Sequence, residues 1–164
     1  MNNELHSSLK EQLLHNHISF LAVRDALMQL DQSTPTRDAS IDNLNFLMDE
    51  DIVAHIDTQH TDIRDAYHKF ISLTSFHVGQ SLALKQDTEA LSYFQQALTE
   101  AQKGNFGSSW IAYIEGTVLY LQGKTIPEDL ISKVTESRNA EILRNFNEGL
   151  VNRGDSQYKE DYMR

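Results

Sequence analysis

The chain has 164 residues, a formal net charge of −10, 40% hydrophobic residues and no cysteine. That length is enough for one domain with a hydrophobic core, and the absence of cysteine excludes disulfides, catalytic thiolates and thiolate metal sites. The acidic excess argues against nucleic-acid backbones and anionic membranes as partners, because both require clustered Lys and Arg. It suits a basic protein or peptide partner instead.

The composition favours an all-α fold. Leu, Ala, Gln and Glu are frequent, β-branched runs are few, and only two prolines and seven glycines interrupt the sequence. The first residues lack the basic and apolar segments of a secretory signal, and no apolar run approaches the ~20 residues of a membrane span. We therefore expect about seven helices in a single cytoplasmic domain that covers residues 1–164.

Residues 4–30 are predicted to form one long helix. Their apolar residues alternate steps of three and four, and the resulting stripe is wide enough to pack against more than one neighbour. The stripe consists of Leu9, Leu13, Leu14, Phe20, Leu21, Val23, Leu27, Met28 and Leu30. Asn16 interrupts the stripe at a core-like position, where we expect it to reach the edge of the interface. The stripe also supports an alternative function, a structural homodimer joined through this first helix.

A polar loop at 31–40 separates this helix from a second one, predicted over 40–56. The three adjacent carboxylates at 49–51 fall in the middle of the second helix. They point around it rather than to one site, which indicates a solvated face. A third helix is predicted over 63–86, and it is expected either to bend at Gly79 or to continue through it.

The central stretch predicts two helices, 88–103 and 108–123, joined by a tight Gly-Asn-Phe-Gly turn. Gly104 follows the last residue of the first helix, and a glycine at that place is expected to adopt a positive φ. Because the link is only four residues long, the two helices should be antiparallel neighbours. A short helix near 128–134 and a last helix over 137–153 complete the chain.

Small and aromatic residues recur around this stretch at positions that let helices approach closely while an aromatic ring fills the space beside them. The glycines among them are separated by close to the ~34-residue period of a known helical repeat. The recurring positions are Gly79, Leu82, Ala90, Phe94, Ala97, Gly116, Leu119, Gly123 and Gly149. In these residues the segment 70–155 resembles the tetratricopeptide repeat.

The resemblance implies antiparallel helix hairpins stacked as a right-handed superhelix, with a binding groove lined by the first helix of each repeat. The chain departs from the family pattern at Glu128, Ser132 and Thr135, where the family has small, aromatic and small residues. An irregular helical bundle, whose glycines cap and pack helices, is the alternative. The expected parts of the domain are an N-terminal helical part (4–60), a tetratricopeptide-like part (61–155) and a polar tail (156–164).

Two carboxylate–histidine pairs are the candidates for a metal site. Asp51 and His55 are spaced i, i+4, and Asp65 and His68 are spaced i, i+3, on helices expected to be antiparallel neighbours. Such pairs project from one helix face and can share a metal ion in helical bundles. Surface carboxylate–histidine pairs are the favoured interpretation, and a metal-binding protein or enzyme that uses these four residues is an alternative.

Aromatic residues of the predicted helix 108–123 are the best candidates for partner binding. Trp110, Tyr113 and Thr117 share a face, and Tyr120 lies near its edge. Trp and Tyr are frequent interface anchors, although core packing is the competing interpretation for Trp110. We therefore expect a non-catalytic protein- or peptide-interaction module, adaptor- or chaperone-like and without a cofactor. Its partner segment would lie in a groove lined by these four residues.

Overall fold

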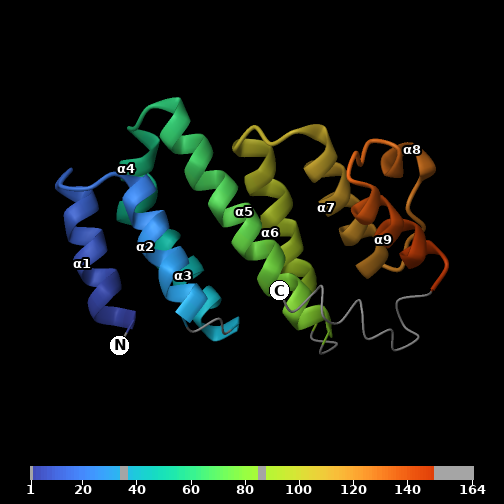
Figure 1. Ribbon diagram of the computed structural model, residues 1–164, viewed down its shortest axis with the longest axis horizontal. Coiled ribbons are helices and arrows are strands. Elements are labelled where there is room, and N and C mark those ends of the chain that lie inside the picture. Colours follow the sequence, from blue (N-terminus) through green and yellow to red (C-terminus); the bar gives the residue numbers. More distant parts are fainter. Residues whose placement is uncertain (1, 34–36, 85–87, 150–164) are drawn as a thin grey trace.

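The helices stand side by side across the molecule, broadly in chain order (Figure 1). The computed structural model describes residues 2–33, 37–84 and 88–149, and all regular elements within these ranges are α-helices. They are Asn2–Leu14 (α1), Phe20–Ser33 (α2), Arg37–Leu47 (α3), Glu50–Asp57 (α4), Thr61–Leu84 (α5), Ala90–Lys103 (α6), Ser108–Leu121 (α7), Glu128–Ile131 (α8) and Ser137–Asn147 (α9). The all-α prediction is confirmed. The predicted tail 156–164 lies outside the described residues.

The described part of the chain holds nine helices rather than about seven, because each of the first two predicted helices is divided. The first divides at Asn16, which takes a positive φ of 59°. The amide of His17 then donates to the carbonyl of Gln12 at 2.8 Å, the main-chain pattern of a helix that ends in a left-handed residue. Ser19 Oγ accepts from the amide of Ala22 at 3.3 Å and caps α2. Asn16 is therefore a helix terminator and not an edge-of-interface residue.

The second predicted helix divides at Asp49, so the three adjacent carboxylates lie at the start of α4 rather than in the middle of a helix. Glu50 and Asp51 are exposed, as expected of a solvated face. The Asp49 carboxylate accepts from the amide of Asp51 at 2.9 Å and caps the start of α4. Lys10 of α1 reaches the same corner, with Nζ 3.0 Å from Asp49 and 3.2 Å from Asp51. Two of the three adjacent carboxylates thus tie α4 to α1, while Glu50 is exposed.

The α5 helix runs unbroken through Gly79, and its contact with α6 is the most extensive between any two described helices. A Cβ atom on residue 79 would lie 3.0 Å from the Phe94 ring, so a larger residue there would require the ring to move. Residue 116 of α7 makes a similar approach to α9, since a Cβ there would lie 2.8 Å from Leu143. As predicted, α6 and α7 are antiparallel neighbours (Figure 1).

The turn between α6 and α7 differs from the prediction in one residue. Gly104 has a φ of −82°, and Asn105 takes the positive φ, 57°. Gly104 is instead required for packing, because a Cβ atom there would lie 3.1 Å from both His68 Cβ and the backbone nitrogen of Lys69. The glycine therefore lets the end of α6 lie directly on α5.

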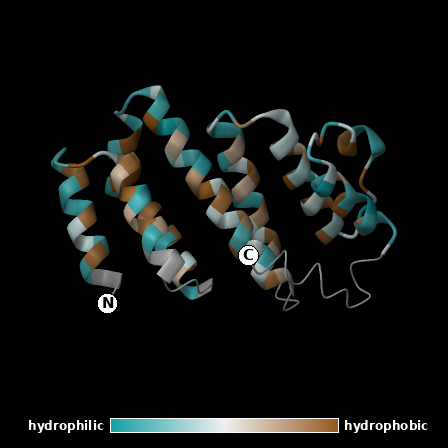
Figure 2. Cartoon of the chain, viewed as in Figure 1, coloured by the Kyte–Doolittle hydropathy of each residue, from teal (hydrophilic) through white to brown (hydrophobic). Residues whose placement is uncertain are grey.

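One cluster of buried apolar residues extends from Leu9 in α1 to Phe146 in α9. Each helix carries both hydrophobic and hydrophilic residues along its length (Figure 2). The apolar stripe of the first predicted helix, which could have formed a homodimer, lies mostly within this cluster. The exposed residues of that stripe are Leu21 and Met28. The stripe is thus used mainly for packing within the chain. In the ranges that the structure describes, no helix combines the length and apolar character needed to cross a membrane.

Candidate functional site

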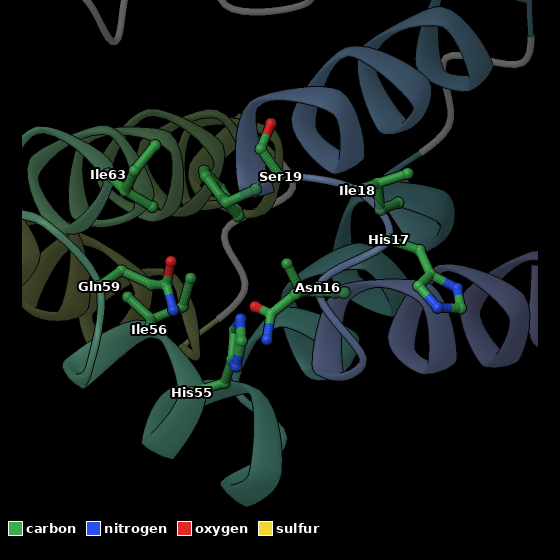
Figure 3. Close-up of a pocket in the computed structure, with 10 residues that line it drawn as sticks. Asn16, His17, Ile18, Ser19, His55, Ile56, Gln59 and Ile63 are labelled. Carbon is green, nitrogen blue, oxygen red and sulfur yellow. The ribbon is translucent and has the colours of Figure 1, made fainter.

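A pocket of about 250 Å³ lies where the turn between α1 and α2 meets the end of α4 and the start of α5 (Figure 3). Two segments that are far apart in the chain, 13–20 and 55–63, build it. The residues that line it are Leu13, Asn16, His17, Ile18, Ser19, Phe20, His55, Ile56, Gln59 and Ile63. The site is thus made at helix ends rather than along a helix face.

The floor of the pocket is apolar and fixed by the core. Leu13, Phe20 and Ile56 are each only 1% exposed. The Phe20 ring is held edge-on by Tyr67, with ring centroids 5.4 Å apart, and Ile63 adds a half-buried wall. Because these side chains also belong to the main core, the hollow should keep its shape before a ligand arrives.

The rim of the pocket carries polar groups, and none of them is Asp, Glu, Lys or Arg. The side chains of Asn16, His55 and Gln59 point into the hollow, whereas His17 points away from it (Figure 3). Asn16 is held there by its left-handed backbone, and His55 by the last turn of α4, where Thr58 Oγ1 donates to the His55 carbonyl at 2.6 Å. Amide side chains both donate and accept hydrogen bonds, so the rim suits a ligand that does both.

The helix ends around the pocket are capped by side chains. Ser19 caps α2, and the Nδ1 atom of His60 accepts from the amide of Asp62 at 3.3 Å at the start of α5. These caps satisfy main-chain amides at the two helix starts beside the hollow. Two walls of the pocket are therefore fixed by local hydrogen bonds as well as by core packing.

The residues predicted to line a groove on α7 have different environments. Tyr113 and Thr117 are 3% and 5% exposed and lie in the core, so in this structure they present no surface to a partner. Trp110 is half-buried, and its Nε1 donates to Ser72 Oγ at 3.2 Å. Tyr120 is also half-buried and stacks on Phe146 with 4.1 Å between ring centroids. Core packing therefore explains much of this aromatic cluster.

The four residues of the alternative metal site do not assemble. Asp51 pairs with Lys10, and His55 faces the pocket. His68 Nδ1 instead donates to Glu100 Oε2 of α6 at 2.5 Å. Within the described ranges, no group of three or more His, Asp or Glu side chains is placed to hold a metal ion. Each carboxylate and its histidine lie one turn apart on one helix, as predicted. The pair on α4 and the pair on α5 have different neighbours, however, and do not form one site.

The His68–Glu100 pair joins α5 to α6 and was not predicted. Glu100 is 6% exposed, so its carboxylate requires the imidazole partner. The adjacent Tyr67 hydroxyl donates to the Leu47 carbonyl at 2.6 Å. Burial raises the pKa of Tyr67, and the negative charges of Glu100 and Asp57 raise it further. These groups form a polar layer inside the helix stack, and they connect α3, α5 and α6.

The sequence held a partial signal for the pocket. Asn16 followed by Ser19 is a helix-stop residue followed by a helix-start residue, and His55 and Gln59 share one face at the end of α4. Neither signal says that the two segments meet, because that contact depends on how α1, α4 and α5 pack.

Comparisons of this chain with protein-family models, with curated proteins and with solved structures found no match. A functional proposal therefore rests on the pocket, its lining residues and the surrounding charges.

Proposed function

We propose that this chain is a non-catalytic interaction module that receives one side chain of a partner polypeptide in the pocket between the α1–α2 turn, α4 and α5. The observation that carries the proposal is a pocket with a buried apolar floor and a polar rim that holds no Asp, Glu, Lys or Arg. Its volume of about 250 Å³ is smaller than the ~300–1,000 Å³ that is typical of small-molecule sites. A single anchoring side chain matches that size.

The surrounding chemistry supports a polypeptide with basic residues near the anchor. The chain carries a net charge of −10, and the exposed Asp57 and Asp62 are sequence neighbours of the lining residues Ile56 and Ile63. Arg64, the cation next to Ile63, donates to Thr61 Oγ1. Complementary charge would speed association with such a partner more than it would tighten the complex. The proposed place of action is the cytoplasm.

The tetratricopeptide-like character of residues 70–155 is part of the proposal. It is supported by the close approach of Phe94 to Gly79 and of Leu143 to Gly116, because both contacts place a large side chain over a glycine. In this arrangement the half-buried Trp110 and Tyr120 would line a second contact area on α7, in addition to the pocket. The pocket remains the primary site because polar side chains from two segments of the chain, Asn16 and Gln59, point into it.

A blocked-pocket variant tests the proposal. Gln59→Trp places a large side chain at the pocket, and Gln95→Trp makes the same change on the exposed face of α6. We expect a partner captured from the native cell extract by the wild-type protein and by Gln95→Trp to be lost with Gln59→Trp. Equal far-ultraviolet circular dichroism would show that both variants fold. Equal capture by all three proteins would contradict the proposal.

A further inference from the structure

We infer that the pocket recognises the main chain of its partner as well as one aliphatic side chain, through the side-chain amides of Asn16 and Gln59. This inference rests on the proposed function and names the chemistry of the ligand. Each peptide group has one N–H donor and one carbonyl acceptor, and each side-chain amide offers both counterparts. The occupant is therefore an extended segment whose large aliphatic residue enters the hollow, with a peptide group on either side.

The two amides are placed for this task from opposite segments. Asn16 comes from the α1–α2 turn and Gln59 from the end of α4, and both point into the hollow (Figure 3). The Asn16 turn is made by main-chain hydrogen bonds, which leaves its side-chain amide for a ligand. Gln59 uses one side-chain N–H in a 3.3 Å contact with Thr58 Oγ1, which leaves its second N–H and its side-chain oxygen for a ligand. Together they offer donors and acceptors on two sides of the floor.

The charge of the lining selects against ionic groups. None of the ten lining residues is Asp, Glu, Lys or Arg. A carboxylate or ammonium group placed against the half-buried apolar side chains of Ile18 and Ile63 would lose much of its hydration. A Leu, Ile or Met side chain loses only unfavourable contact with water, and its neighbouring peptide groups keep hydrogen bonds at the rim. A pocket lined without Asp, Glu, Lys or Arg thus complements an uncharged segment of main chain and aliphatic side chain.

The test is a titration of the ¹⁵N-labelled protein with N-acetyl-leucine N-methylamide, which has one aliphatic side chain between two peptide groups. For a ligand of ~13 non-hydrogen atoms we expect a Kd on the order of 1 mM. The shifts should concentrate at residues 16–20, 55–59 and 63. An analogue with both amide nitrogens methylated has lost its N–H donors and should bind about tenfold more weakly. N-acetyl-aspartate N-methylamide should not saturate the site.

Two variants and one control assign the contacts. Asn16→Gly keeps the turn, because glycine readily takes a φ of 59°, and removes the amide. Gln59→Leu removes the other amide at similar size, and Gln95→Leu repeats that change on the exposed face of α6. We expect each pocket variant to weaken the leucine probe about fivefold to tenfold, with little effect on the methylated analogue. The Gln95→Leu protein should bind both probes as the wild type does.

Two outcomes would overturn the inference. If the leucine probe and its methylated analogue bind equally, recognition is apolar only; the pocket could still anchor a partner, and the blocked-pocket capture experiment would decide that separately. If no shift appears at the pocket up to roughly 20 mM probe, well above the expected Kd, the main-chain recognition is wrong. Loss of capture by Gln59→Trp would then still support the broader function.

Discussion

The ring of Phe94 lies on the bare Cα of Gly79, so closely that a Cβ atom on residue 79 would be 3.0 Å from Phe94 Cε2. This contact sets how closely α5 approaches α6, and these two helices make the most extensive helix–helix contact in the described structure. Gly116 and Leu143 repeat the relationship between α7 and α9. Two glycines thus determine how closely the C-terminal helices pack, although both sit in helix interiors, where glycine lowers helix stability.

Replacing Gly79 by alanine should destabilise the protein. Alanine favours the helix by about 1 kcal/mol, but the buried ring of Phe94 would have to move, and overpacking of this kind costs about 1–3 kcal/mol. We expect a lower midpoint of urea unfolding with an unchanged slope. His77→Ala, at an exposed position of the same helix, is the control and should change the free energy of unfolding by less than about 0.5 kcal/mol. A midpoint for Gly79→Ala that is raised above that of the wild type would refute the packing role.

The Tyr67 hydroxyl should contribute measurably to stability. Tyr67→Phe removes the 2.6 Å hydrogen bond to the Leu47 carbonyl and leaves a core carbonyl without that donor. We expect the free energy of unfolding to fall by about 1–3 kcal/mol. Tyr93→Phe, a half-buried tyrosine on α6, makes the same chemical change and should be close to neutral. Chemical denaturation of the two variants gives the comparison, and equal effects would contradict the assignment.

The ion pair between Lys10 and Asp49 should shape the dependence of stability on pH. The hydrogen bond from Lys10 holds the pKa of Asp49 below its ordinary 3.8, and the same bond, with that to Asp51, raises the pKa of Lys10 above 10.5. A carboxyl group whose pKa is lowered by folding stabilises the fold when the pH is above its pKa in the unfolded chain. That stabilisation is lost as the pH falls through its pKa in the folded protein. A lysine whose pKa is raised by folding stabilises the fold when the pH is below its pKa in the unfolded chain. That stabilisation is lost as the pH rises through its pKa in the folded protein.

The stabilisation from this pair is therefore present between about pH 4 and pH 10 and lost on either side. The melting temperatures of wild type and Lys10→Met should differ within that window and converge below about pH 3. Lys133→Met, which removes an exposed lysine, should leave the shape of the profile unchanged. Both side chains are partly exposed to solvent, so added salt should reduce the difference. A constant difference down to pH 2 would show that packing of the lysine stem is responsible.

The left-handed backbone at Asn16 predicts that alanine and glycine at this position will affect stability differently. Asn16→Ala forces a residue with a Cβ and no polar group into a φ of 59°, and it should cost about 1–2 kcal/mol of stability. Asn16→Gly relieves the same strain and should be neutral or slightly stabilising. Thermal melts followed by circular dichroism distinguish them. If alanine and glycine behave alike, the turn does not depend on the backbone of residue 16.

Helix content could be predicted because apolar periodicity is local. The helices α5, α6 and α7 lie close to the predicted ranges, and their buried faces include Phe94, Ala97 and Ala101. The errors arose where one residue has two possible roles. Asn16 was read as an interruption of an apolar stripe, but its left-handed backbone ends a helix. Asp49 was read as a mid-helix carboxylate, but it caps a helix start.

The candidate site could not be predicted because it depends on contacts between distant segments. Tyr113 and Thr117 look like one face of an amphipathic helix, yet neighbouring helices cover that face. His68 meets Glu100 rather than the Asp51–His55 pair on α4, since α5 packs more extensively on α6 than on α4. The pocket joins residues near 16, 55 and 63, whose proximity follows only from helix packing.

The most direct test of the pocket as a partner site is photocrosslinking inside the native cell. A benzoylphenylalanine at position 59 reports on the pocket, the same group at position 95 reports on the exposed face of α6, and a third at position 120 reports on α7. We predict a discrete covalent adduct with a second polypeptide from position 59, and none from position 95. An adduct from position 120 with none from position 59 would contradict the pocket as the partner site and return the binding surface to α7.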